Sequence, residues 1–229
     1  MGIIYLYMSR FMYKYRNGPK KQRAIKKNEP DEDEEEDGDG GGGGGGDTDN
    51  QKISRENNHV YFHAEVNRGT IFQVIIHLRA AEEACILMNH RYSTTDIPIY
   101  LHINSFGGSV FDAMTAIDVI QNSKVPVYTI IEGATASAGT LMSVVGKKRF
   151  MRPNAYMLIH QLSSGCWGKM AEIEDEFKNL QSLMLHIKNI YKENAKIPKK
   201  ELSDILKHDL WWDKDTCIQY GLVDEVWAN

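Results

Sequence analysis

The chain has 229 residues, 42% of them hydrophobic, so it is long enough to bury a core of its own. Its charge is unevenly divided: residues 1–49 contain 8 lysines and arginines against 11 acidic residues, whereas residues 50–229 contain 19 against 20. A nearly neutral body argues against a nucleic-acid-binding protein, and the opening apolar stretch, interrupted by Arg10, is too short to cross a membrane.

The first 51 residues predict a disordered tail. A basic block from Arg16 to Lys27 precedes an acidic run from Asp31 to Asp39 and seven consecutive glycines, Gly40 to Gly46. Such a segment cannot offset its loss of conformational entropy by burying apolar side chains. We therefore expect a charged and glycine-rich tail over residues 1–51 and one domain over residues 52–229.

The cysteines favour a reducing compartment. Their number is odd, they are widely spaced, and no Cys-x-x-Cys pair is present to hold a metal ion: Cys85, Cys166 and Cys217. We expect a cytoplasmic protein. The alternative is an organellar matrix or stroma, if the basic block of the tail is a targeting signal.

The domain predicts repeated strand–helix units. Strand patterns alternate with helix patterns in chain order: strand 59–66, helix 70–90, strand 97–104, helix 108–123, strand 125–131, helix 137–146, then one or two strands within 149–160. This alternation is typical of an α/β fold with a mainly parallel sheet. A turn and a short strand over 220–227 close the chain.

The longest helix is predicted over residues 170–191. Apolar side chains recur along it at helical spacings: Met170, Ile173, Phe177, Leu180, Leu183, Met184, Ile187, Ile190 and Tyr191. Such a stripe usually faces the core. Because few later elements are available to cover it, a subunit interface is the second interpretation.

Three chemically suggestive groups follow three successive strands. The pair Gly107-Gly108 can bring a backbone N–H close to a ligand, Ser137 lies between small residues, and His160 ends an apolar run. Because the ends of neighbouring strands meet at one crevice in open α/β folds, we expect these groups to form a single site. A serine there needs a base and an oxyanion-stabilising donor to act as a nucleophile.

The spacing around the serine argues against an α/β-hydrolase. "TASAG" lacks the first glycine of the G-x-S-x-G elbow, and the acidic residues downstream of His160 give the chain order Ser, His, Asp. Spacing alone leaves the acid open among six candidates: Asp175, Asp204, Asp209, Asp213, Asp215 and Asp224.

Four sequence blocks resemble the ClpP family of self-compartmentalising serine peptidases. They are "YLHINSFGGSV", "GATASAGT", "RFMRPNAYMLIHQ" and "YGLVDEV", in the family's order. The resemblance implies a ClpP/crotonase-type fold with a long handle helix. It also implies Ser137 as nucleophile, His160 as general base and Asp209 as orienting acid, with the N–H groups of Gly108 and Ala138 as oxyanion donors.

The resemblance further implies two stacked heptameric rings that hydrolyse unfolded proteins and peptides, fed by an AAA+ Clp ATPase, with no cofactor, metal, nucleic acid or membrane. The sequence departs from the family at Phe106, which replaces a proline, at Ala138 and Thr140, and in "HDLWWDKD" after the acid. By the same resemblance, the segment "ISRENN" corresponds to a shortened axial loop of the family.

Two alternative functions are open. A crotonase-like acyl-CoA enzyme would share the fold and the paired oxyanion donors but would not need the Ser-His-Asp set. A catalytically inactive structural or regulatory ring subunit would share the fold as well, since fold does not imply activity.

Overall fold

The computed structural model of the protein describes residues 52–228. A seven-stranded sheet organises them, in the order β1-β2-β3-β4-β5-β7, with β6 paired to β4. The strands are β1 Lys52–Glu56, β2 His59–His63, β3 Ile99–Ser105, β4 Val127–Ala136, β5 Lys148–Met151, β6 Tyr156–Leu158 and β7 Glu225–Val226. Among the pairs formed by these seven strands, only β1–β2 is antiparallel, so the predicted mainly parallel sheet is confirmed.

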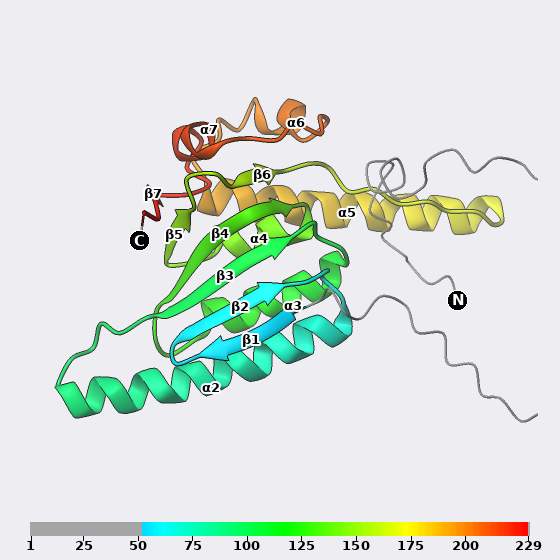
Figure 1. Ribbon diagram of the computed structural model, residues 1–229. Helices are drawn as coiled ribbons and strands as arrows, with labels where there is room; N and C mark the ends of the chain where they lie inside the picture. Colours follow the sequence, from blue (N-terminus) through cyan, green and yellow to red (C-terminus); the bar gives the residue numbers. More distant parts are fainter. Residues whose placement is uncertain (1–51, 229) are drawn as a thin grey trace, which may run out of the picture.

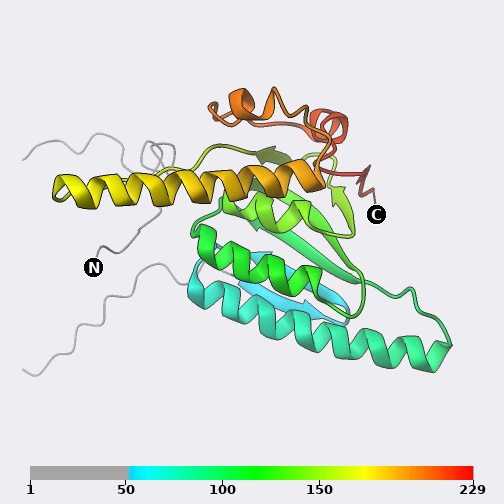
Figure 2. The same ribbon diagram turned by 180° about the vertical axis from the view of Figure 1, so that it is seen from behind.

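The longer helices cover one face of the sheet, and α6 and α7 lie at its edge beyond β6 (Figure 1 and Figure 2). The helices are α2 Arg68–Tyr92, α3 Val110–Gln121, α4 Ala138–Val144, α5 Met170–Asn194, α6 Leu202–Ile205 and α7 Lys214–Gln219. Figure 1 shows the sheet with α2, α3 and α4 behind it, and Figure 2, the view from behind, shows these helices side by side with α5. The core between the layers is apolar, with Leu101, Ile103 and Ile131 of the sheet fully buried.

One strand was not predicted from the sequence. Residues 52–56, which include most of the "ISRENN" segment expected to be a shortened loop, form β1 and pair with β2 through a tight turn at Asn57-Asn58. Asn57 has φ 53°, and asparagine tolerates this left-handed conformation better than most residues. The first sheet strand therefore begins before His59.

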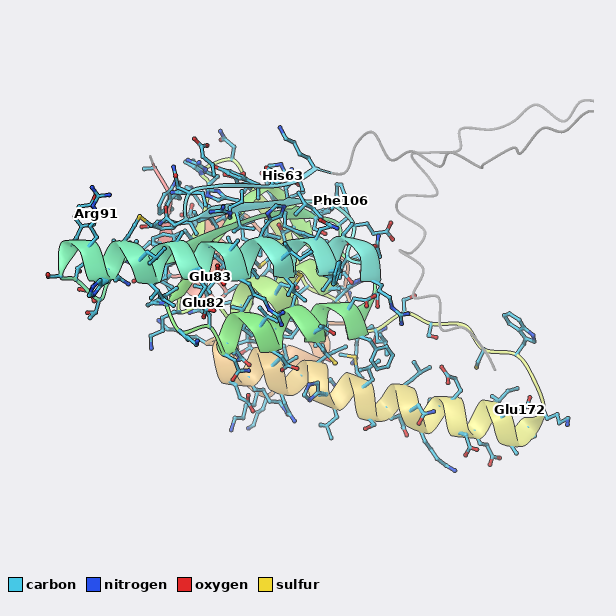
Figure 3. All side chains as sticks on the ribbon, turned by 90° about the horizontal axis from the view of Figure 1, so that it is seen from below. His63, Glu82, Glu83, Arg91, Phe106 and Glu172 are labelled. Atoms are coloured by element: carbon cyan, nitrogen blue, oxygen red, sulfur yellow. The ribbon has the colours of Figure 1, made fainter. Side chains whose placement is uncertain are left out.

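The long helix α5 is buried only at its C-terminal end. Ile187, Ile190 and Tyr191 are buried, whereas Met170 and Phe177 are exposed. Figure 3 shows the N-terminal end of α5, marked by Glu172, standing well clear of the body of the molecule. The predicted apolar stripe is therefore divided: one end belongs to the core and the other is uncovered within the subunit.

A bulge in β4 divides the edge opposite β3 between two partner strands. Ile103 of β3 pairs with Ile131, but Ser105, two residues on, pairs with Thr135, so β4 has two extra residues around Gly133. Gly133 has φ 57°, a conformation that glycine adopts without a steric penalty. Before the bulge β4 pairs with β5, and beyond it with β6. The bend thereby aligns β6 with the end of β4, where Ser137 follows.

Candidate active site

Ser137 lies at the junction of β4 and α4 in a strained backbone conformation. Its φ is 54° and its ψ is −126°, which is rare for a residue with a side chain. The backbone N–H donates to the Leu158 carbonyl over 3.0 Å, and the Ser137 carbonyl accepts from the Thr140 N–H and hydroxyl. The Ser137 side chain makes no capping bond to α4. The backbone of Ser137 is thus held by hydrogen bonds, while its hydroxyl group does not cap the helix.

His160 and Asp209 form a direct pair. His160 Nδ1 donates to Asp209 Oδ1 over 2.9 Å, since a carboxylate can only accept. The His160 side chain is 18% exposed and that of Asp209 is 52% exposed. This tautomer leaves the Nε2 lone pair of His160 available to accept a proton.

Strand pairing explains why Asp209 faces His160. Met157 and Trp212 exchange both backbone hydrogen bonds in an antiparallel bridge. Three residues on from Met157 is His160, and three residues back from Trp212 is Asp209, so the same register sets them opposite each other. The structure thereby distinguishes Asp209 from the other five acidic candidates.

Strand β6 places His160 just beyond the strand end that is paired with the end of β4. Leu158 pairs with Ala136 in the parallel β4–β6 ladder and accepts the Ser137 N–H. His160 follows Leu158 by two residues, and Ser137 follows Ala136 directly. Ser137 and His160 therefore extend from the adjacent ends of neighbouring strands.

The glycine turn 107–108 packs against Ser137. Gly107 has φ 95°, and a side-chain carbon placed on it would lie 2.7 Å from Ser137 Cβ. Gly108 has φ 142°, and a Cβ there would lie 2.2 Å from the Val66 carbonyl oxygen. Only glycine fits either position, so the predicted need for both glycines has a steric cause.

Two backbone N–H groups lie in the segments next to Ser137. Val66 binds the Gly107 carbonyl and the Ser109 N–H, so Gly108, between them, directs its own N–H to the other side. Ala138 is the first residue of α4, where the N–H has no acceptor within the helix. Within the described residues 52–228, neither N–H donates to a protein acceptor.

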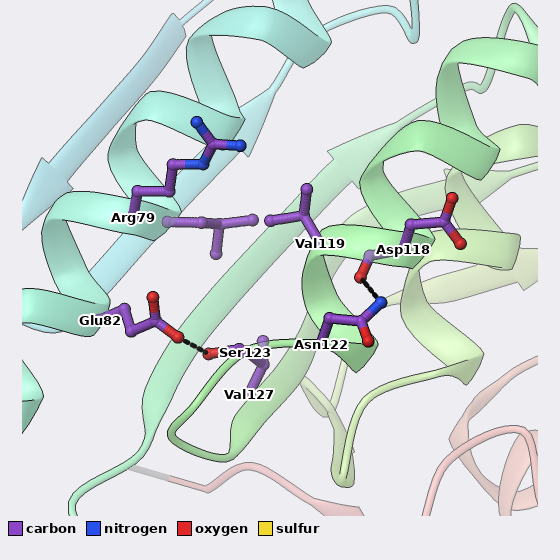
Figure 4. A pocket seen from close by; sticks show the side chains of 8 residues that line it. Arg79, Glu82, Asp118, Val119, Asn122, Ser123 and Val127 are labelled. Atoms are coloured by element: carbon purple, nitrogen blue, oxygen red, sulfur yellow. Dashed lines mark hydrogen bonds between the residues drawn. The ribbon is translucent and has the colours of Figure 1, made fainter.

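A cavity adjoins the His160–Asp209 pair, and another lies far from Ser137. The cavity in Figure 4, about 250 Å³, is lined by Leu78 and Glu82 of α2, Val119 of α3 and Val127. Val127 begins β4 and Ser137 follows its end, so this cavity lies far from the serine. A second cavity, about 370 Å³, is lined by Ile159, His208 and Leu210, the immediate neighbours of His160 and Asp209.

One aromatic contact at the site was not predicted from the sequence. Phe106 and Trp211 meet edge to face, with ring centroids 6.1 Å apart. The sequence marked Phe106 only as a departure from the family, because nothing local predicts a contact with a residue more than one hundred positions away.

The arrangement is that of a site for acyl transfer: a serine at a strand–helix junction, a histidine–carboxylate pair and two unengaged N–H groups. The model of the Clp protease family matches residues 55–229. The chain is 34% identical over 134 residues to the ATP-dependent Clp protease proteolytic subunit 2 of Treponema denticola, covering 58% of this chain and 67% of that protein. It is likewise 34% identical over 135 residues to the ATP-dependent Clp protease proteolytic subunit of Streptococcus mutans, covering 57% and 69%. The chain belongs to the Clp protease family.

Family membership confirms three expectations from the sequence: the ClpP family itself, the α/β fold with a long handle helix, and the serine peptidase class of the enzyme. In the part of the chain that the structure describes, no helix is both long and apolar enough to cross a membrane.

Proposed function

We propose that the protein hydrolyses peptide bonds of unfolded proteins and peptides, with Ser137, His160 and Asp209 as its catalytic residues. One observation carries the assignment: the 2.9 Å hydrogen bond from His160 to Asp209, two residues beyond the Leu158 carbonyl that binds the Ser137 N–H. This links all three residues through adjacent strand ends.

The mechanism is acyl transfer in two steps. Ser137 Oγ attacks the peptide carbonyl carbon while His160 Nε2 takes the hydroxyl proton and then gives it to the leaving amine. Water attacks the resulting ester with the same histidine as base. Asp209 holds the imidazole in the tautomer with Nε2 free and stabilises the imidazolium. The chain's own residues supply every group that this reaction needs, without a metal or cofactor.

The Gly108 and Ala138 N–H groups bind the oxyanion. Both lie beside Ser137, and both are already fixed by the Val66 pairing and by the start of α4. Preorganised donors of this kind are typically the largest electrostatic contribution to acyl transfer. The free side of the glycine turn can also pair with an extended substrate, which favours broad specificity because main-chain hydrogen bonds do not depend on side chains.

The assembly we propose is two stacked heptameric rings fed by an AAA+ Clp ATPase. The uncovered apolar N-terminal half of α5 and the "ATP-dependent" names of both relatives support it. We further propose that residues 52–229 are the peptidase domain, and that the tail, which lies outside the described residues, can be deleted without loss of peptide hydrolysis. The three cysteines are free thiols, which supports a location in the cytoplasm or another reducing compartment.

Hydrolysis of a fluorogenic peptide by wild type and Ser137→Ala tests the function. Loss of the nucleophile lowers kcat by about 10⁶-fold. Ser164→Ala, at an exposed serine, is the matched control and retains full activity. An inactive wild type would favour the ring-subunit alternative, and acyl-CoA turnover that survives Ser137→Ala would favour the crotonase-like enzyme.

A further inference from the structure

The loop that carries Asp209 is fixed by backbone hydrogen bonds at its two ends but not between them. At one end the Leu206 carbonyl accepts from the Gln161 N–H, and at the other Trp212 pairs with Met157. Within the described residues, the N–H groups of residues 209–211 donate to no backbone carbonyl, and the only hydrogen bond of the Asp209 carboxylate is the one from His160. A half-exposed carboxylate on such a loop needs another restraint to stay on the imidazole.

Packing on the outer side of the loop does not provide that restraint. His208 and Leu210 line the 370 Å³ cavity behind the loop, and Leu210 is 61% exposed. Trp212 stacks on Tyr220, with ring centroids 4.8 Å apart, but this packing fixes only the end of the loop that is already paired. Since side chains alternate along an extended segment, Asp209 and Trp211 face the other way, toward the site. The restraint must therefore come from the site side.

Phe106 meets Trp211 on that side. The two rings are 6.1 Å apart with an interplanar angle of 87°, the edge-to-face arrangement that aromatic pairs favour. Phe106, labelled in Figure 3, is 44% exposed, although Ser105 and Gly107 on either side of it are buried. Its ring is thus held by a rigid turn and not by burial of the ring itself.

This contact connects the two halves of the site. Phe106 is bonded to Gly107, which packs against Ser137, and Trp211 lies two residues from Asp209. A shift of the loop that took the carboxylate away from His160 would also pull Trp211 from Phe106. The rings and the hydrogen bond therefore restrain the same movement.

We propose that Phe106 and Trp211 are positioning residues: their aromatic contact, called here the aromatic bridge, holds the 209–211 loop so that Asp209 stays bonded to His160. The proposal rests on the catalytic roles assigned above. The bridge touches neither of the reacting atoms and acts through Asp209. It replaces burial as the means of fixing an otherwise exposed catalytic acid.

The test measures kcat and KM for peptide hydrolysis by Phe106→Ala and Trp211→Ala in the full chain. Each substitution lowers kcat by about 10- to 100-fold and leaves KM within about twofold, because small misplacements of a catalytic group are costly. Phe106→Tyr keeps the ring and restores kcat. Tyr92→Ala removes an aromatic ring that is 65% exposed at the far end of α2, and it leaves both constants unchanged.

A second arm repeats Phe106→Ala in an Asp209→Asn background. If the bridge acts through Asp209, the added substitution changes the remaining rate by less than about twofold, since residues that act as a unit are not additive. A full additional loss in that background would overturn the proposal, as would wild-type kcat in both single alanine variants. Phe106→Leu and Trp211→Leu, checked by thermal melting, replace any alanine variant that does not fold.

Failure of the bridge and failure of the proposed function give different results. An active wild type whose kcat is insensitive to Phe106 and Trp211 overturns only the bridge. A wild type whose hydrolysis survives Ser137→Ala overturns the function on which the bridge rests.

Discussion

Single residues at the site are constrained by backbone geometry more than by side-chain packing. Ser137 adopts positive φ despite having a side chain, and its neighbour Gly107 approaches it closely enough to exclude any Cβ. A strained backbone conformation persists only where neighbouring groups hold it in place. Here the hydrogen bonds of Ser137 with Leu158 and Thr140 do so.

Gly108→Ala should lower kcat strongly. A methyl group would lie 2.2 Å from the Val66 carbonyl, so the turn must move and the N–H proposed as oxyanion donor moves with it. Loss of one such donor lowers kcat by about 10²- to 10³-fold. Gly165→Ala is the control, because a Cβ there meets nothing within 4 Å. Steady-state kinetics showing equal kcat for both variants would contradict the steric argument.

At the residue scale, the sequence predicts those site residues whose role leaves a pattern in the neighbouring residues of the chain. The Gly107-Gly108 turn and Ser137 could be found because small residues and strand–helix junctions leave a local signal. Asp209 could be selected only through the family resemblance, because its position opposite His160 depends on the pairing of Met157 with Trp212. The aromatic bridge could not be found, since it joins segments distant in the chain.

At the scale of elements, α5 is tied to the nucleophile segment by a buried hydrogen-bond chain. The Tyr191 hydroxyl and Thr140 Oγ1 are 2.6 Å apart, and Thr140 Oγ1 donates to the Ser137 carbonyl, so Tyr191 is the donor to Thr140. Burial raises the pKa of the Tyr191 phenol well above its ordinary value and keeps it protonated. The handle helix thereby helps fix the backbone of Ser137.

Thr140→Val should be more destabilising than the double variant Thr140→Val/Tyr191→Phe. The single change leaves a buried phenol without an acceptor, at a cost of about 1–3 kcal/mol in the free energy of unfolding, whereas replacing both partners is nearly neutral. Urea denaturation of the three proteins measures this. A double variant less stable than Thr140→Val would show that the hydroxyl pair has another role.

A second polar chain crosses strands β2, β3 and β4. His59 and His102 lie 2.9 Å apart through ring nitrogens, and Glu132 bonds His102 at 2.9 Å and His63 at 3.2 Å. These hydrogen bonds, first that of His102 and then that of His63, hold the pKa of Glu132 well below its ordinary range. Within the sheet, Glu132 therefore stays ionised in the folded state.

Glu132→Gln should lower stability at pH 7 by about 2 kcal/mol, the usual contribution of hydrogen bonds to a charged group. A carboxyl whose pKa is depressed on folding stabilises fully above its unfolded pKa, about 4.3, and loses that contribution as pH falls through its folded pKa. The difference from wild type should therefore narrow below about pH 4.

Thermal melts at several pH values measure this difference. Glu225→Gln, which removes an exposed pair with Lys148, is the control and should change stability by less than about 1 kcal/mol. A difference between Glu132→Gln and wild type that grows as the pH falls would contradict the assigned direction of the pKa shift.

Most of the elements follow from the sequence, but β1 and the short helices α6 and α7 do not. Strand and helix patterns predicted the parallel sheet and its helices because each periodicity is local. The pattern did not predict β1, whose stability depends on its pairing with β2. The sequence predicts one apolar stripe on α5. Helical periodicity alone cannot show which of its residues are buried in the subunit and which remain exposed for contact with another subunit.

At the scale of the whole molecule, the projecting part of α5 is the surface through which we propose that subunits join. Ile187 is buried in its own subunit, whereas Phe177 is 60% exposed on the part of α5 that projects from the body. We expect Phe177→Asp to break the assembly into smaller species, because burying an unpaired carboxylate in an interface is costly. Ile187→Asp should instead unfold the subunit.

Sedimentation velocity and circular dichroism together separate these outcomes. Asn179→Asp, an exposed polar position on the same helix, is the control and should leave the assembly intact. A folded Phe177→Asp variant that sediments as wild type does would remove the projecting half of α5 from the interface.

The most direct test of the account is covalent labelling of the full-length protein with a fluorophosphonate, followed by peptide mass spectrometry. We predict one adduct per subunit, on Ser137, lost in Ser137→Ala and formed far more slowly in His160→Ala, since only an activated serine is a good nucleophile. A wild-type protein that hydrolyses peptides without forming this adduct, or that is labelled at another residue, would contradict the assignment of Ser137 as the nucleophile.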